Sequence, residues 1–167
     1  MELQIKPLEI NHGREILNWR YSYPYDIYNF QGDIEHGLAN LLAPDNAFFA
    51  ILNLQGVLEG YCSFGADGQV PGGDYRAAGL DIGMGIRPDL TGKGNGKFYA
   101  QAVVDYEIEH FQSEQLRVTI ADFNQRAQRV WRKVGFEPAK AFYKTGTENK
   151  FVILCRILER QSSSYSK

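Results

Sequence analysis

The sequence predicts an α/β domain of the α+β kind, in which a mixed sheet carries helices on both faces. Its 167 residues are 44% apolar and 23% charged, which suits one globular domain with a sizeable core. Runs in which apolar and polar residues alternate occur along the whole chain, and this alternation is typical of strands. In the second half, two segments with apolar residues at helical spacing separate such runs.

The first half of the chain predicts a strand, two helices and an antiparallel hairpin. The expected elements are a strand around residues 3–5, helices over residues 14–20 and 33–42, and strands over residues 47–54 and 57–64. Gln55 and Gly56 separate the last two strands, as a short hairpin turn requires. A cluster of aromatic residues lies between the two helices, and Pro24 interrupts any continuous helix there.

The second half predicts four strands and two helices. The expected elements are strands over residues 80–86, 115–121, 136–143 and 149–158, a helix over residues 97–111, and a helix that begins after Asn124. In the first of these strands the apolar side chains share one face, and Asp81 shares the other face with two glycines. Asn124 is a good N-cap for the last helix, and Gly135 stands where a C′ residue belongs. The apolar stripe of the first helix is expected to consist of Ala100, Val104, Ile108 and Phe111.

Composition and charge exclude several classes of function. Lys and Arg number 18 and Asp and Glu number 20, so the net charge of −2 excludes a protein that binds nucleic acid mainly through its phosphates. No segment has the roughly 18 consecutive apolar residues of a membrane helix, so we expect a cytoplasmic protein without membrane contact. Cys62 and Cys155 lie in apolar runs and are expected to be free, buried thiols. The domain is expected to span residues 1–160, with a polar, disordered tail over residues 161–167.

The segment over residues 80–101 carries the clearest sign of chemistry. A strand leads into the run TGKGNG at residues 91–96 and then directly into a helix, so backbone N–H groups converge at a positive helix end. Its glycines let the backbone approach a diphosphate closely. The run is not a Walker loop, because neither of its Gly-Lys pairs precedes Ser or Thr, and it lacks the third glycine of a Rossmann fingerprint. We therefore predict a phosphate-binding loop, with a plain glycine-rich turn as the alternative.

Two motifs resemble those of the GNAT family of N-acetyltransferases. The phosphate-binding signature of that family is Gln or Arg, two variable residues, Gly, one variable residue, and Gly or Ala. Gly94 and Gly96 match it, whereas Thr91 replaces the Gln or Arg. The second motif is matched by Asn124, Ala127, Val130, Trp131, Gly135 and Phe136, and the resemblance covers roughly residues 47–158. It implies a mixed, mostly antiparallel central sheet of about six or seven strands, and acetyl-CoA as co-substrate without a metal.

The resemblance also implies which residues bind the donor. The backbone of residues 91–96 would hold the diphosphate, and the backbone of residues 84–86 would pair with the pantetheine arm. Asn124 would bind the pantetheine or adenosine side, or would serve only as a helix cap, and basic residues after it would add positive charge. The expected donor-binding residues are Met84, Gly85, Ile86, Thr91, Gly92, Lys93, Gly94, Asn95, Gly96, Asn124 and Arg129.

Acetyl transfer to an amine requires a base, because an alkyl amine with a pKa near ~10.4 is unprotonated only about one part in 10³ at pH 7. Asp81 is the expected base, since it lies on the glycine-lined face of the strand where members of the family that the chain resembles often carry an acidic base, and Glu59 is the reserve candidate. The alternative is that Asp81 pairs with an arginine or lines solvent. Many family members carry a proton-donating tyrosine where this chain has Trp131. Tyr143 or Tyr99 would then supply the proton, unless solvent does.

The expected acceptor is a primary amine of a small molecule or peptide. The aromatic cluster falls on the segment that covers the acceptor site in the family that the chain resembles, and aromatic rings suit a cationic amine. The alternative is that half of these side chains belong to the core. The histidines lack metal-ligand spacing, so no metal site is predicted. The expected acceptor-binding residues are Trp19, Tyr21, Tyr25 and Tyr28.

Two other functions fit the same sequence features. The tryptophan at the usual tyrosine position also fits an acyl-CoA-binding module or sensor with weak catalysis. The glycine-rich loop also suits an enzyme that uses a flavin or a nucleotide. The sequence leaves the oligomeric state open, a homodimer included.

Overall fold

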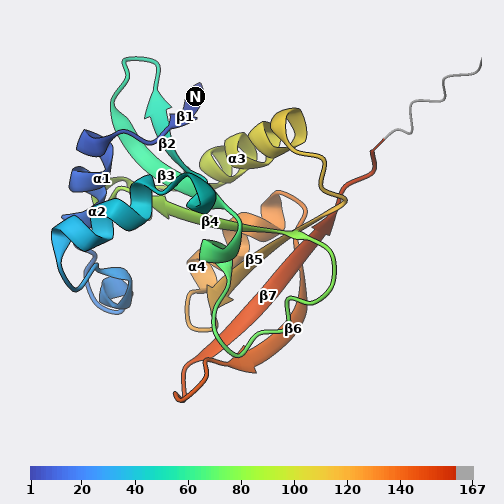
Figure 1. Cartoon of the computed structure of the whole chain (residues 1–167). Helices are drawn as coiled ribbons and strands as arrows, with labels where there is room; N and C mark the ends of the chain where they lie inside the picture. The colour runs from blue at the N-terminus through green and yellow to red at the C-terminus, as the bar shows by residue number, and fades with distance from the viewer. Residues whose placement is uncertain (161–167) are drawn as a thin grey trace, which may run out of the picture.

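The computed structural model describes residues 1–160, in which a seven-stranded sheet is combined with four α-helices (Figure 1). The order of strands and helices is the expected one, and the mixed fold with helices on both faces is confirmed. The tail predicted over residues 161–167 lies outside the described residues. The elements are β1 (Leu3–Pro7), α1 (Ile10–Leu17), α2 (Ile34–Leu42), β2 (Phe48–Asn53), β3 (Leu58–Phe64), β4 (Leu80–Ile86), α3 (Gly96–His110), β5 (Gln115–Ala121), α4 (Gln125–Lys133), β6 (Glu137–Tyr143) and β7 (Lys150–Ile157).

Polar side chains set where the helices begin. The Asp33 carboxylate accepts a hydrogen bond from a backbone N–H of the first turn of α2 at 2.9 Å, as an N-cap does. α1 differs from the helix expected over residues 14–20, because it begins at Ile10. The backbone N–H of Glu9 donates to Nδ1 of His12 at 3.1 Å and completes a capping box there.

The sheet is split at its centre. Its strand order is β1-β2-β3-β4-β5-β7-β6, and β4 and β5 form the one parallel pair among the described strands. Their register ends where Ile82 lies opposite Val118. Beyond that point β4 continues beside β3, with Ile86 opposite Gly60, whereas β5 continues beside β7. The two central strands therefore diverge over residues 83–86.

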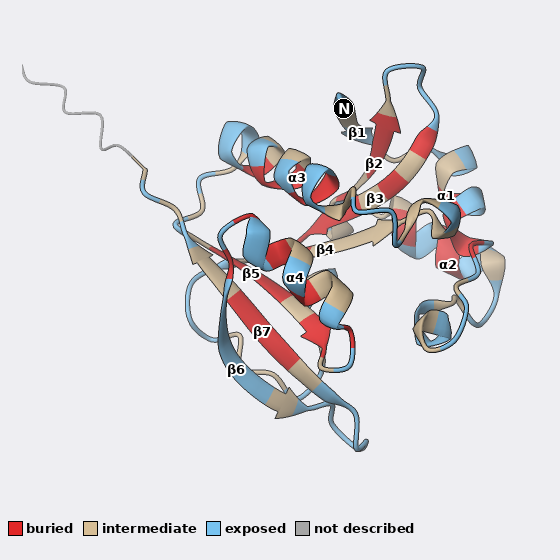
Figure 2. Ribbon diagram, turned by 180° about the vertical axis from the view of Figure 1, so that it is seen from behind, coloured by how far each residue is buried: buried red, intermediate tan, exposed pale blue. Residues whose placement is uncertain are grey.

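Helices cover both faces of this sheet. α1 and α2 pack against β2 and β3 in a buried cluster that includes Leu38 and Ala50. α3 and α4 cover the opposite face, where Val103 and Trp131 join buried residues of the central strands. Figure 2 shows this second face, with the buried sides of α3 and α4 turned toward the strands. The split between β4 and β5 therefore lies between the layer formed by α1 and α2 and the layer formed by α3 and α4.

The buried face of α3 differs from the expected stripe. Ile108 is 44% exposed, whereas Glu107 is fully buried. Nη2 of Arg160 lies 3.1 Å from Oε1 and 3.2 Å from Oε2 of Glu107, so the buried carboxylate has a charged partner. A buried charge needs such a partner, and this one is 53 positions away along the chain. The pattern of apolar residues in α3 alone therefore does not indicate that Glu107 is buried or that Arg160 is its partner.

Other expectations about the chain concern cysteines, membranes and metals. Cys62 is buried, Cys155 is half-buried, both are free, and burial raises the pKa of both thiols. Over residues 1–160, no helix combines the length and the apolar character that crossing a bilayer requires. In the same part of the chain, His, Cys, Asp and Glu side chains form no group of three or more that could hold a metal ion.

Candidate active site

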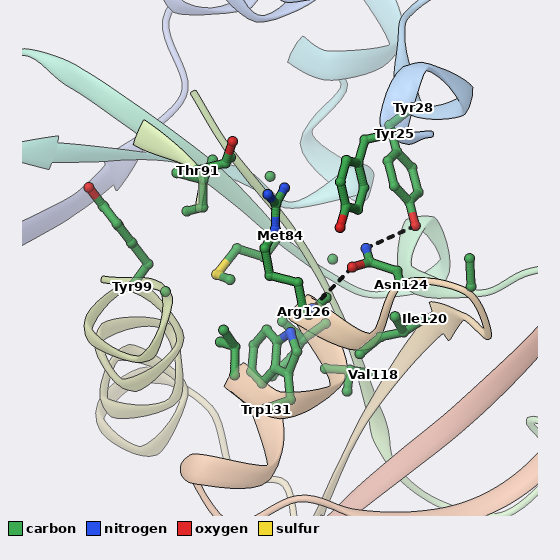
Figure 3. Close-up of a pocket in the computed structure, with 18 of the residues that line it drawn as sticks. Tyr25, Tyr28, Met84, Thr91, Tyr99, Val118, Ile120, Asn124, Arg126 and Trp131 are labelled. Carbon is green, nitrogen blue, oxygen red and sulfur yellow. Dashed lines mark hydrogen bonds between the residues drawn. The ribbon is translucent and has the colours of Figure 1, made fainter. Parts of the chain in front are cut away.

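The divergence of β4 and β5 opens a cavity of about 570 Å³, shown in Figure 3. Its walls come from both diverging strands, the loop before α3, the first turn of α3, the length of α4, β3 with the turn after it, and the aromatic segment between α1 and α2. A volume of this size suits a small organic ligand. The lining includes Tyr21, Tyr25, Tyr28, Tyr61, Asp67, Met84, Tyr99, Asn124, Arg126 and Trp131.

One edge of β4 is open toward this cavity. The backbone N–H of Arg87 donates to the carbonyl of Glu59 at 2.9 Å, so the odd-numbered positions turn their polar backbone groups toward β3. Met84 and Ile86, at even positions, therefore turn theirs toward the split. The carbonyl of Ile86 accepts a hydrogen bond from the hydroxyl of Tyr21 at 2.6 Å. The rest of this edge can pair with an extended ligand in the manner of an added strand.

The open edge leads to the glycine-rich loop before α3. Gly92 and Gly94 have φ angles of +72° and +79°, which glycine adopts without strain. The space where a side chain of Gly94 would begin is empty, since no atom lies within 4 Å of that point. Thr91 and the glycines of this loop line the cavity. The loop therefore brings bare backbone to the positive end of α3, an arrangement that binds anions.

Basic side chains add to this positive end. A guanidinium nitrogen of Arg126, Nη1, lies 3.2 Å from the position that a Cβ of Gly92 would take. Among the described residues that line the cavity, Asp67 is the only acidic one. The side of the cavity next to α3 and α4 is therefore electropositive and suits a diphosphate. The basic residues that line it are Lys97, Arg126, Arg129 and Lys133.

Asn124 connects α4 to the aromatic segment. Its Oδ1 accepts the backbone N–H of Ala127 at 3.0 Å, and its Nδ2 donates to the hydroxyl of Tyr28 at 3.2 Å, as the dashed lines in Figure 3 show. Nearby, the guanidinium carbon of Arg126 lies 4.1 Å from the ring centroid of Tyr25. Asn124 therefore caps α4 and also lines the cavity.

The fold and this cavity correspond to known proteins. The sequence model of the acetyltransferase (GNAT) domain matches residues 6–137. The chain belongs to the GNAT family. A chimera of the spermidine N-acetyltransferase SpeG from Vibrio cholerae and hSSAT has 19% identity and a TM-score of 0.73, over 94% of this chain and 96% of that chain. A GNAT acetyltransferase from Bacillus anthracis has 16% identity and a TM-score of 0.72, over 94% and 95% of the two chains. No curated protein matches the chain.

The GNAT assignment confirms the resemblance derived from the two sequence motifs. The family match extends further toward the N-terminus than those motifs, since it begins at residue 6. It includes the strands on both sides of the split and the loop before α3. Acetyltransferases of this family use acetyl-CoA as the acetyl donor.

Within this GNAT domain, Asp81 does not reach the cavity. It is 3% exposed, and its two oxygens accept hydrogen bonds from Nε and Nη2 of Arg117, each at 2.9 Å. Oδ2 also accepts one from Gln69 at 2.9 Å. A base must reach the proton that it removes, and both oxygens of Asp81 are already bound inside the protein. The alternative of a pair with an arginine therefore describes Asp81, and we do not retain its predicted role as the base.

Asp67 is the carboxylate that lines the cavity instead. It lies in a short 3₁₀ turn, η3 (Ala66–Gly68), directly after β3, and accepts a hydrogen bond from the hydroxyl of Ser63 at 3.2 Å. Partial burial raises the pKa of Asp67, and the hydrogen bond from Ser63 opposes that rise. Burial together with the charge of Asp67 raises the pKa of Tyr61 to about 12. The sequence analysis missed Asp67, because a glycine-rich loop has no periodic pattern.

Neither phenol expected to donate a proton is placed to do so. Tyr143 is 61% exposed at the end of β6 and lies outside the cavity lining. Tyr99 is buried, and its hydroxyl donates to Glu59 at 2.8 Å; burial and this bond raise the pKa of Tyr99. Trp131 is 4% exposed, packs edge-on against Phe136 and contributes its indole to the cavity wall (Figure 3). We therefore drop Tyr143 and Tyr99 as the expected proton donors.

The remaining predicted residues divide between the cavity and the core. Trp19 is 8% exposed and packs against Tyr61 in the cluster beneath α1 and α2, so the core alternative applies to it. Lys93 and Asn95 belong to the loop before α3 but do not line the cavity, whereas the other predicted donor-side residues do. The predicted acceptor-side residues that line the cavity are Tyr21, Tyr25 and Tyr28.

Proposed function

We propose that this GNAT domain is an acetyl-CoA-dependent N-acetyltransferase that acetylates a primary amine by direct attack in a ternary complex. The observation that carries the proposal is the open edge of β4, which leads from the middle of the cavity to the loop before α3. The coenzyme carries two amide groups in its pantetheine arm and a diphosphate at the far end of that arm, which match such an edge and such a loop. Similar structures include spermidine N-acetyltransferases, which supports an amine as acceptor.

The residues of the donor side fit the coenzyme in two places. The backbone groups of Met84 and Ile86 on the open edge would pair with the amides of the pantetheine arm. The N–H groups of residues 92–96, with Arg126 and Arg129 beside them, would bind the diphosphate. When bound, the coenzyme supplies an acetyl thioester. This arrangement would direct it toward the split between β4 and β5.

Asp67 would act as the general base. The acceptor ammonium must lose a proton before its nitrogen can attack, and an ionised Asp67 would take that proton directly or through one water. Its raised pKa makes it a stronger base than an ordinary aspartate. Trp131 offers an indole N–H without a titratable proton, so the departing sulfur would receive its proton from water.

The proposal also implies which molecules the protein binds and where it acts. Its substrates would be acetyl-CoA and an amine of a small molecule or peptide, and no step involves nucleic acid or a membrane. We place the reaction in the cytoplasm. The free thiols of Cys62 and Cys155 support this location, since disulfides form in oxidising compartments.

Calorimetry with coenzyme A and a thiol-release assay with acetyl-CoA test the proposal together. We expect saturable coenzyme binding and release of free thiol that depends on an added primary amine. Coenzyme binding without thiol release from any amine would instead indicate an acyl-CoA-binding module, the alternative that Trp131 favours. Absence of coenzyme binding would overturn the proposal.

The loop before α3 permits a more specific test. Gly94→Ala is expected to weaken coenzyme A binding about five- to thirtyfold, because holding alanine at a left-handed φ costs about 1–2 kcal/mol. Relaxation to a negative φ would turn the N–H groups of the loop away from the cavity. Gly56→Ala is the matched control, since Gly56 has a φ of +78° and an equally empty Cβ position in the β2–β3 turn. Calorimetry should show unchanged affinity for that control, and equal losses in both variants would count against the loop as the binding site.

A further inference from the structure

The aromatic side of the cavity has a single negative charge. Tyr21, Tyr28 and Tyr61 line it together with Asp67, and Asp67 is the only acidic side chain among the described lining residues. The ring of Tyr61 covers Gly85, where a side chain would collide with it. Oδ2 of Asp67 lies 3.3 Å from the position that a Cβ of Gly83 would take, two positions before Gly85, so the carboxylate and the phenol flank the same face of β4. One cationic group can therefore be neutralised here, with aromatic rings around it.

The positive charge of Arg126 lies next to the aromatic residues that line the cavity. The guanidinium of Arg126 lies over the ring of Tyr25, 4.1 Å from its centroid, so this ring already contacts a cation. Tyr21 lines the same cavity as Arg126, and burial raises the pKa of its phenol. A second ammonium group on the acceptor would find no second carboxylate among the described lining residues, and burying a cation without a counter-charge is unfavourable.

Two of the tyrosines that line the cavity also pack against an exposed ring outside the lining. Phe123 is 43% exposed and Tyr28 is 44% exposed, and their rings are stacked with centroids 6.5 Å apart. Tyr25 packs against the same phenylalanine at 5.9 Å. Exposed rings next to a cavity provide an apolar contact surface for a ligand. The cavity of about 570 Å³ must also admit the acetyl end of the donor, so the acceptor is small.

We infer that the acceptor is a small monoamine with one cationic centre and an uncharged aromatic or apolar body, such as an arylalkylamine, and not a polyamine. This inference rests on the proposed function and narrows its acceptor. The ammonium group lies beside Asp67, and the body of the acceptor contacts the rings of Tyr28 and Tyr61. Arg126 remains with the diphosphate of the donor, next to Gly92.

Thiol release from acetyl-CoA with 2-phenylethylamine, spermidine and phenylalanine tests this inference on the full chain. We expect kcat/KM for 2-phenylethylamine to exceed both other values by about tenfold or more. An equal or higher kcat/KM for spermidine would overturn the inference that the acceptor has a single cationic centre. An equal or higher kcat/KM for phenylalanine would overturn the inference that the body of the acceptor is uncharged. The carboxylate of the amino acid would in that case pair with Arg126.

A binding measurement separates this inference from the proposed function. Calorimetry of the same three amines with protein saturated with coenzyme A reports acceptor preference without turnover. If no amine releases thiol, the proposed function fails, and tighter binding of 2-phenylethylamine still supports the monoamine site. If thiol is released but spermidine binds as tightly or more tightly, the inference fails and the acetyltransferase survives.

A variant pair tests the contact with the aromatic body. Tyr28→Ala is expected to raise KM for 2-phenylethylamine about tenfold and to leave kcat within about twofold, whereas KM for ethylamine, which has no ring, should not change. Ile27→Ala is the matched control, because Ile27 is 60% exposed on the same 3₁₀ turn, η1 (Tyr25–Tyr28), and lies outside the cavity lining. Equal changes in both variants, or equal changes for both amines, would show a general structural effect and overturn the ring contact.

Discussion

Asp67→Asn is expected to lower kcat/KM for amine acetylation roughly 10²–10³-fold. The asparagine side chain can still accept a hydrogen bond from Ser63, but it cannot take a proton from the acceptor ammonium. Coenzyme A affinity should stay within about twofold, since Asp67 belongs to η3, beside Gly83 of β4, and not to the loop before α3. Steady-state thiol release and calorimetry measure these two quantities separately.

The pH profile provides a second readout for Asp67. Partial burial raises the pKa of its carboxyl group above the usual range of an aspartate. The ionised form is the active one, so kcat/KM should fall as the pH is lowered through this raised pKa. In Asp67→Asn this acidic limb should be absent, and the residual activity should be flat in that range. A limb that persists in the variant would show that another group is the base.

Glu59→Gln is the matched control for this prediction. Glu59 accepts hydrogen bonds from Tyr99 at 2.8 Å and from Asn53 at 3.1 Å, and it lies outside the cavity lining. We expect kcat/KM of this variant to stay within about threefold of the unmodified protein. If Glu59→Gln were inactive and Asp67→Asn active, the base would be Glu59, the reserve candidate from the sequence.

Local patterns predict the elements of this fold well, but not the split in its sheet. The bounds of β4 and β5 match those expected from alternation, because alternation depends only on residues within each strand. The split depends instead on which strands pair, since β5 leaves β4 after Val118 and continues beside β7. No feature of residues 83–86 by itself specifies that change of partner. The residue pattern indicated the phosphate-binding loop, and the family resemblance added residues 84–86 as the expected place of the pantetheine arm.

The candidate site shows the same limit. Alternation placed Asp81 on the glycine-lined face of β4, but the Arg117 that binds it is 36 positions away on β5. Asp67 follows β3 in a loop without periodicity, so only the folded chain shows that it reaches the cavity. Tyr143 and Trp19 have the right chemistry, yet one lies at the exposed edge of the sheet and the other in the core. Sequence indicates the residue types, and long-range packing decides which of them meet.

Asp81→Asn is expected to lower the free energy of unfolding by about 3–5 kcal/mol, because it leaves the buried guanidinium of Arg117 without its counter-charge. For a domain of this size, that loss corresponds to a decrease in Tm of about 6–20 °C. Thermal and urea unfolding measure it. Arg14→Gln is the control, since it breaks an exposed pair with Glu35 and should cost less than about 1 kcal/mol. Equal losses in the two variants would contradict the prediction.

The same buried pair holds the segment that carries Asp67. Gln69, two positions further along the chain, donates to Asp81 at 2.9 Å, and Arg117 donates to the carbonyl of Ala77 at 2.7 Å. Assayed at a temperature where it is folded, Asp81→Asn should therefore lower kcat about tenfold by displacing Asp67. Its pH profile should keep the acidic limb, because the base is still present. If Asp81 were itself the base, the limb would disappear in Asp81→Asn and persist in Asp67→Asn, so the two profiles distinguish the base from the residue that positions it.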